Sequence, residues 1–169
     1  STSVSNVYAG ADAKVLAGNN ELTTLNVSTV TDAAGFIEAV NGGVEKITVS
    51  NDFTLTDDIV IPEKTTVTIA EGKTLTLANG KTLTVNGAIT GTIKGTAATG
   101  GTDGVAKLED FSGDFQVKAG SLEITGASIE NGKITVVSGN IVIDGKINGD
   151  IEFVNGISGE NKANVIFRN

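Results

Sequence analysis

Few side chains in this chain could do chemistry, and carboxylates come first among them. Paired acids occur at Asp57-Asp58 and Glu109-Asp110, and Asp114 follows closely. Two carboxylates across a cleft are the working groups of a glycosidase, and carboxylate oxygens also bind calcium. The chain has no His and no Cys, the usual ligands of zinc and the residues of most nucleophile–base pairs. We therefore expect solvated acids on corners and loops, no cofactor and no enzyme activity.

Two kinds of glycine motif could bind an ion or a phosphate. Gly100-Gly101-Thr102-Asp103-Gly104 partly matches a calcium-binding turn, but it is not repeated in tandem, so a plain turn is favoured over calcium. Gly-Lys-Thr at 72–74 and at 80–82 lacks the earlier glycine of a phosphate-binding loop. These pairs are expected to be corners, and no nucleotide is expected.

The net negative charge of the chain disfavours two classes of partner. Twenty acids against 12 bases give a net charge of −8, which repels nucleic acid and anionic lipid. No apolar run approaches the roughly 20 residues that span a bilayer, so membrane insertion is not expected. The small, polar residues from Ser1 onward are typical of a secreted protein after removal of its signal peptide. The absence of Met and Cys fits the same secreted, extracellular or cell-surface location.

A short repeat then indicates the elements that must position these groups. Three successive eight-residue units begin Thr66-Val67-Thr68-Ile69, Thr74-Leu75-Thr76-Leu77 and Thr82-Leu83-Thr84-Val85. Strand alternation puts their aliphatic residues on one side and their Thr residues on the other. Such Thr pairs resemble an ice-binding ladder, but an eight-residue step leads to a neighbouring face, so too few pairs would align.

A longer repeat decides how these strands are connected. Phe115/Val117, Ile134/Val136 and Ile151/Phe153 recur at spacings of 19 and 17. An antiparallel meander with a hairpin at Asn79-Gly80 is the alternative, but it does not produce such a register. Two or three strands in about eighteen residues form one coil of a solenoid.

The sequence therefore predicts an all-β fold, a single-stranded parallel β-helix (β-solenoid) over residues 31–169. A cap at Thr31 or Asp32, apolar residues at helical spacing and Asn41-Gly42-Gly43 predict a capping helix over about 32–41. The polar stretch over about 95–110 is expected to be a loop or a break. Residues 1–30 are expected to form an extended N-terminal arm without a partner nearby in sequence, available as an exchanged strand.

Asp32–Gly43 followed by Lys46–Gly87 resembles the opening of pectate-lyase-like right-handed parallel β-helices in bacterial secreted and surface proteins. Those often begin with a short capping helix and continue with coils such as Lys-Thr-Leu-Thr-Val-Asn-Gly. The resemblance covers residues 31–93 well and 113–155 loosely. It implies a fold that hosts many functions. An enzyme of that kind would need acids such as Asp57 and Asp58 beside a base, and the one Arg lies at position 168.

The two ends of such a β-helix suggest a function for the protein. A terminal coil exposes backbone groups and a slice of core, and the run from Ala163 to Phe167 stays apolar without a polar cap. We therefore expect a structural subunit of an extracellular fibre or matrix that assembles with itself, head to tail, by β-helix stacking and N-terminal strand addition. The predicted assembly residues are Val4, Val7, Tyr8, Val15, Leu22, Leu25, Val165, Ile166 and Phe167.

Two other functions stay open at this point. The first is a secreted or cell-surface module that binds polysaccharide along a coil face, in the manner of an adhesin. The second, least favoured, is a degenerate pectate-lyase-like enzyme that would release unsaturated sugars and depend on Asp57 and Asp58.

Overall fold

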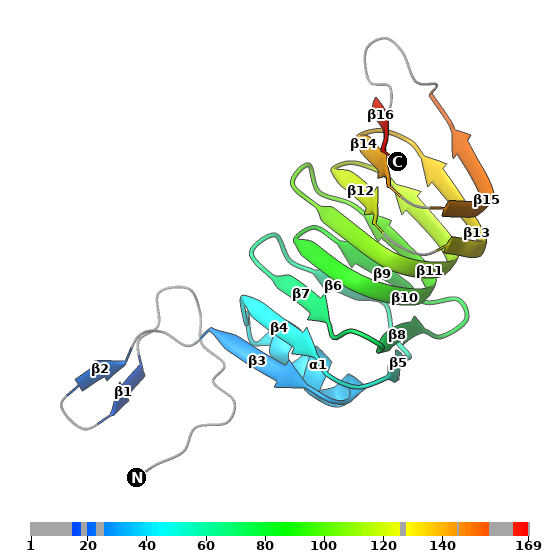
Figure 1. The fold of residues 1–169 in the computed structure, drawn as a ribbon. Helices are drawn as coiled ribbons and strands as arrows, with labels where there is room; N and C mark the ends of the chain where they lie inside the picture. The colour runs from blue at the N-terminus through cyan, green and yellow to red at the C-terminus, as the bar shows by residue number, and fades with distance from the viewer. Residues whose placement is uncertain are drawn as a thin grey trace.

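Stacked parallel strands dominate a computed structural model of the chain, and they wind into a β-solenoid of about six turns with one short helix (Figure 1). Fourteen strands belong to this one sheet system. The prediction of an all-β parallel solenoid is confirmed. The structure describes residues 15–17, 20–22, 26–125, 128–144, 146–155 and 164–168.

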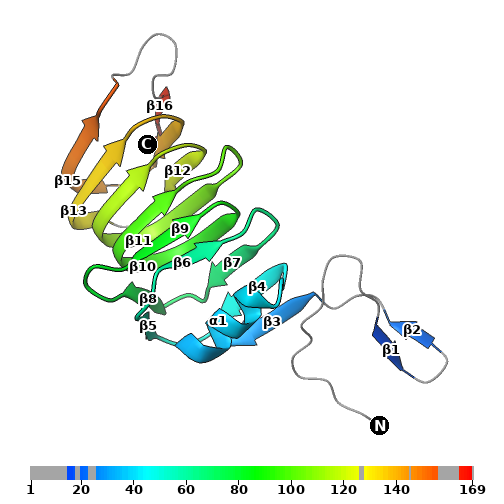
Figure 2. The same cartoon turned by 180° about the vertical axis from the view of Figure 1, so that it is seen from behind.

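Each coil contributes to three faces, which run the length of the stack and are seen from both sides (Figures 1 and 2). The first face consists of β3 (Val27–Val30), β4 (Lys46–Val49), β7 (Thr66–Ile69), the starts of β10 (Ala88–Thr99) and β11 (Val105–Val117), β12 (Ser121–Ile124), β14 (Asn140–Ile143) and β16 (Asn164–Phe167). The second face consists of β5 (Phe53–Leu55), β8 (Thr74–Leu77), the middles of β10 and β11, and the starts of β13 (Ser128–Val136) and β15 (Lys146–Phe153). The third face consists of β6 (Ile59–Ile61), β9 (Thr82–Val85) and the ends of β10, β11, β13 and β15.

The eight-residue repeat supplies one strand to each face of a single coil. Its three copies are β7, β8 and β9, and each pairs with a different part of β10. Their aliphatic residues are buried, as the alternation predicts, and the Thr residues between them point outward. The three Thr pairs therefore lie on three faces and do not stack on one another.

The coil becomes shorter at β10 because its corners are tighter there. Thr66 and its partner Ala88 are 22 residues apart, whereas Ala88 and its partner Val105 are 17 apart. In β10 the corners are single glycines, Gly91 and Gly95, with φ of 131° and 120°. Glycine adopts this backbone region without a steric penalty. The single strand β10 thus turns through all three faces.

The expected loop or break over about 95–110 is wrong. Most of this stretch lies in β10 and β11, and only residues 100–104 form the turn between them. The inward positions here hold small residues, among them Ala97 and Ala106, both fully buried. The alternation continues, but Leu108 is the large aliphatic residue that marks it here, and one such residue does not show a period in the sequence.

Helix α1 (Ala33–Asn41) closes the N-terminal end of the core. Its N-cap is Asp32, whose Oδ1 accepts a hydrogen bond of 2.7 Å from the Gly35 amide. Phe36 is fully buried, and its ring centroid lies 5.9 Å from that of Phe53 in β5. The helix contacts β3, β4 and β5 and lies across the end of the stack (Figure 1).

The described part of residues 1–30 differs from the expected arm without local partners. Strands β1 (Val15–Ala17) and β2 (Asn20–Leu22) pair antiparallel with each other in a separate two-stranded sheet. Strand β3 pairs in parallel with β4 and so belongs to the solenoid. Short-range pairing satisfies backbone groups that an isolated extended segment would leave to solvent.

Candidate functional site

The C-terminal end of the solenoid exposes apolar side chains that the fold would otherwise bury. Strand β16 pairs with β14 and with no other strand among the described residues. Phe167 lies above Ile143 on the inward side of the first face, yet it is 75% exposed, whereas Ile143 is 6% exposed. A core position without a following coil explains this difference.

The neighbouring third face ends in the same way. Ile151 and Phe153, at the end of β15, are only partly buried against the core, and Val154 beyond them is 54% exposed. Ile166 is 47% exposed beside Phe167. We call this surface the C-terminal apolar end; it consists of Ile151, Phe153, Val154, Val165, Ile166 and Phe167. Large apolar patches of this kind mark interaction sites.

Strand pairing holds β16 on one side only. It forms a four-residue parallel ladder with β14, and the Asn164 side-chain amide donates to Asn140 Oδ1 at 2.9 Å. Just beyond the strand, Arg168 Nη1 lies 3.5 Å from Glu123 Oε1, and Lys107 Nζ lies 3.9 Å from the other oxygen of Glu123. The side chains of Lys107 and Arg168 are about half exposed, and such pairs contribute little to stability. The outer edge of β16 pairs with no strand among the described residues.

The structure places only some of the predicted assembly residues. Val165, Ile166 and Phe167 lie together in the C-terminal apolar end. Val15 and Leu22 lie opposite each other in the β1–β2 pair, outside the solenoid sheet. The other four predicted residues are outside the described part of the chain: Val4, Val7, Tyr8 and Leu25.

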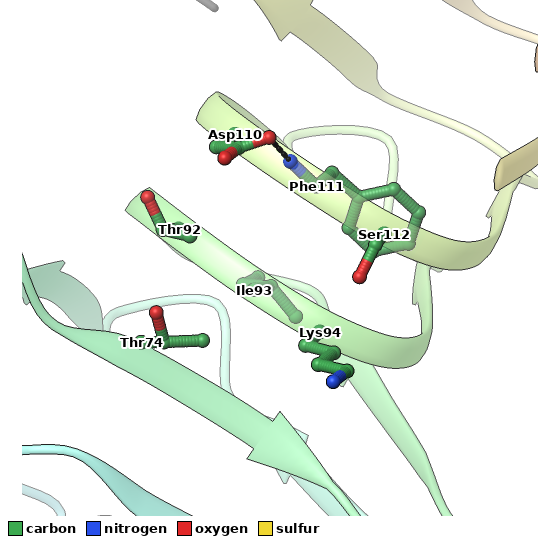
Figure 3. Close-up of a pocket in the computed structure, with 7 residues that line it drawn as sticks. All are labelled: Thr74, Thr92, Ile93, Lys94, Asp110, Phe111 and Ser112. Atoms are coloured by element: carbon green, nitrogen blue, oxygen red, sulfur yellow. Dashed lines mark hydrogen bonds between the residues drawn. The ribbon is translucent and has the colours of Figure 1, made fainter. Parts of the chain in front are cut away.

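A second feature is a polar depression of ≈ 360 Å³ on the second face (Figure 3). Thr74, Thr92 and Asp110 follow one another up successive coils, and Lys94 and Ser112 form the neighbouring column. The buried side chains of Ile93 and Phe111 form its base. An adjoining depression of ≈ 530 Å³ shares Lys94 and Ser112 and extends to Asn79. We call the two together the second-face trough.

The polar groups of the trough are largely without protein partners. Lys94 is exposed and forms no ion pair within the part of the chain that the structure describes. Asp110 Oδ1 accepts one bond, 2.9 Å from the Phe111 amide (Figure 3). A cation, a carboxylate and several hydroxyl groups therefore lie in two adjacent columns on one face. This set suits a hydroxylated or charged ligand.

The candidate acids of the sequence lie on different faces or bond the backbone. Asp58 Oδ1 accepts from the Thr82 amide at 2.8 Å, just as Asp52 Oδ1 accepts from the Thr74 amide at 2.7 Å. Each carboxylate thus accepts the amide hydrogen of the first residue of β8 or β9, in the coil that follows it. Asp110 lies on the second face and Asp114 on the third, where Asp114 is in register with Lys133. Asp58 thus bonds the backbone at the start of β9.

No group of three or more acidic, His or Cys side chains that could hold a metal ion occurs among the described residues. In the glycine motif at 100–104, the Gly104 amide bonds the Gly101 carbonyl at 3.0 Å, which closes a turn between β10 and β11. The described helix is too short to cross a membrane.

The second-face trough and the capping role of Asp52 were not predicted from the sequence. Both depend on which residues of successive coils lie side by side. The trough residues Thr74, Thr92 and Asp110 are 18 apart, which is close to the period of the longer sequence repeat and was a usable signal. Asp52 and Thr74 are 22 residues apart, so that period does not align them.

Comparisons with models of known protein families, with curated proteins and with solved structures give no match for this chain. The fold and the two surfaces define its class: a parallel β-solenoid with a helical cap at one end and an apolar coil edge at the other.

Proposed function

We propose that this protein is a non-enzymatic structural subunit that assembles with itself, head to tail, into an extracellular fibre or matrix. The observation that carries the proposal is the C-terminal apolar end, where Phe167 is 75% exposed at a position whose equivalents in earlier coils are buried. Burial of such a surface by another molecule is favourable at about 25 cal/mol per Å² of apolar area.

The partner that this end fits best is the N-terminal end of a second copy. The first face has an edge strand at each end, β16 and β3, and both are parallel strands of four residues. Val27 of β3 is 46% exposed and Ile166 of β16 is 47% exposed. Addition of the β3 edge to the β16 edge would continue the sheet, and a heterologous contact of this kind produces a filament.

The exposed core of one copy cannot stack directly on the core of the next, because α1 covers the N-terminal end of the incoming copy. Its outward side carries exposed Ala34 and Glu38, with Ile37 half-buried between them. The remaining apolar surface around Phe153 therefore needs another cover. We assign this to the part of the N-terminal segment of the incoming copy that precedes β3, which would supply the predicted strand addition.

An extracellular location is part of this proposal. The chain has neither Cys nor Met, so it is insensitive to oxidation at sulfur. The resemblance of its coils to pectate-lyase-like helices of bacterial secreted and surface proteins supports the same placement. Secretion and bacterial origin would be tested by locating the native protein in fractionated source cells.

The assembly surface is tested by one charge at its centre. Phe167→Asp should abolish concentration-dependent association in sedimentation velocity and filaments in negative-stain electron microscopy. Val60→Asp is the matched control, because Val60 is 52% exposed on β6 in the middle of the stack. If Phe167→Asp self-associates as strongly as Val60→Asp and the parent chain, the C-terminal apolar end is excluded as the interface.

The role of the N-terminal segment needs its own variant. Removal of residues 1–18 should leave a folded solenoid that stays monomeric, with the circular dichroism of the full chain. If the shortened protein still forms filaments, strand addition by this segment is wrong, and β3–β16 contact alone drives assembly.

A second candidate function is polysaccharide binding, favoured by the second-face trough. Its Lys94 and Ser112 lie beside Thr92 and Asp110 along successive coils, so a sugar chain along the helix axis would meet donors and acceptors repeatedly. Binding of the Phe167→Asp monomer to a glycan array, reduced by Lys94→Ala and not by Lys118→Ala outside the trough, would support it. No binding to neutral or acidic glycans would exclude it.

A further inference from the structure

Asn-Gly pairs occur six times in this chain, and each could undergo the same spontaneous reaction. The Gly backbone nitrogen attacks Cγ of the Asn side chain, ammonia leaves and a succinimide forms. Water then opens the ring to Asp or isoaspartate, so one water is consumed for each ammonia released. The pairs are Asn41-Gly42, Asn79-Gly80, Asn86-Gly87, Asn131-Gly132, Asn148-Gly149 and Asn155-Gly156.

The hydrogen bond of the Gly amide separates the three pairs whose Asn and Gly are both fully described. The Gly42 amide donates to the Glu38 carbonyl at 2.9 Å, and the Gly87 amide donates to the Ile61 carbonyl at 3.2 Å. The Gly80 amide donates no hydrogen bond within the part of the chain that the structure describes. An attacking nitrogen that is already bonded must first break that bond, so only Gly80 is free to react.

Packing separates the same pairs. A Cβ atom on Gly87 would overlap the carbonyl oxygens of Thr65 and Pro62, so this backbone is enclosed on both sides. A Cβ atom on Gly80 would meet nothing within 4 Å. Asn79 and Gly80 are both exposed. Water and the rotation that brings Cγ to the nitrogen are therefore accessible at this corner.

The Asn79 side chain is also unrestrained. It makes no hydrogen bond within the described residues, and it sits in a four-residue turn closed by the Lys81 amide on the Ala78 carbonyl at 3.0 Å. Gly80 has φ of 77°. The equivalent corner one repeat earlier has Glu71 and Gly72 with φ of 78°, closed by Lys73 on Ala70 at 3.0 Å. The turn thus accepts a side chain other than Asn.

We infer that Asn79 is a selective deamidation site, at which the folded protein converts Asn to Asp and isoaspartate while Asn41 and Asn86 are protected. The product adds a negative charge to the rim of the second-face trough, which Asn79 shares with Lys94. Isoaspartate also adds one backbone atom to the corner between β8 and β9. The inference does not depend on the function proposed above.

The test is to age the full-length folded protein in mildly alkaline buffer and to follow deamidation by peptide mass spectrometry. The rate at Asn79 should exceed the rates at Asn41 and Asn86 by about tenfold or more, as expected for a hydrogen bond that need not be broken. Under denaturing conditions the three rates should converge, because the protection comes from the fold. Equal rates in the folded protein, or a faster rate at Asn41 or Asn86, would overturn the inference.

Asn79→Glu is the control variant, because Glu71 already occupies the equivalent corner. It should fold with unchanged stability, and ageing should produce fewer acidic variants in ion-exchange chromatography than in the parent chain. If acidic variants accumulate as fast as in the parent chain, Asn79 is not the selective site and the inference is wrong.

Discussion

The two ends of the solenoid meet the same physical problem and resolve it differently. At the N-terminal end, α1 covers the last slice of core, and Phe36 is 0% exposed. At the C-terminal end no described element covers β15 and β16, and Phe167 is 75% exposed. One end is closed within the chain, and the other leaves apolar side chains exposed, where we propose that a second copy binds. The difference gives the molecule a direction.

The local sequence explains why only one end is closed. Asp32 caps a helix whose apolar residues recur at helical spacing, so they all meet the core. The C-terminal residues form a strand, β16, through Phe167, with three consecutive apolar side chains. A strand at that position can only continue the sheet.

The largest expected effect on stability is at the N-terminal end, which α1 closes. Phe36→Ala removes a fully buried ring that contacts Phe53, and it should lower the free energy of unfolding by about 3–5 kcal/mol. Chemical denaturation followed by circular dichroism measures it. A loss no greater than that of Phe167→Ala would contradict the difference between the two ends.

A smaller effect is expected from the helix cap. Asp32→Ala removes the acceptor of the Gly35 amide, 2.7 Å away, and should cost about 1 kcal/mol. Asp57→Ala is the control, because Asp57 is exposed and caps no helix. Equal stability of the two variants would mean that α1 does not depend on its N-cap.

The ion pairs of β16 should contribute less. Glu123→Gln weakens its contacts to Lys107 and Arg168 at 3.9 and 3.5 Å, and the expected loss is below about 1 kcal/mol. It should shrink further at high salt, which screens exposed charges. A larger loss that persists in salt would show that β16 is anchored more firmly than its exposure indicates.

The smallest effect on stability is expected at the open end. Phe167→Ala should change the free energy of unfolding of the monomer by no more than about 0.5 kcal/mol, as for other exposed positions. The same variant should weaken self-association in sedimentation velocity. Destabilisation comparable to that of Phe36→Ala would mean that Phe167 is buried within the subunit.

Much of the fold could be predicted because periodicity is local information. The Thr-rich repeat identified the inward residues of β7, β8 and β9, and the helical spacing around Phe36 identified α1. The stretch over about 95–110 failed because its buried positions hold Ala97 and Ala106, which carry almost no hydrophobic signal. The pairing of β1 with β2 was missed for a related reason: three-residue strands are too short to show a period.

Of the two candidate sites, one could be predicted from local sequence and the other could not. The C-terminal apolar end was predictable, because Val165, Ile166 and Phe167 are adjacent in sequence. The second-face trough was not identified, because Thr74, Thr92 and Asp110 come from three coils. These three residues are 18 apart on the second face, whereas the separation on the first face changes from 22 to 17 residues at β10. No single period therefore aligns the columns of both faces.

Amide hydrogen exchange, compared below and above the concentration at which the protein associates, tests the central claim most directly. Association through the C-terminal apolar end predicts new protection in residues 146–153 and 164–168, with no change in β8 or the middle of β10. New protection confined to the second-face trough, or no concentration-dependent protection at β15 and β16, would contradict this account.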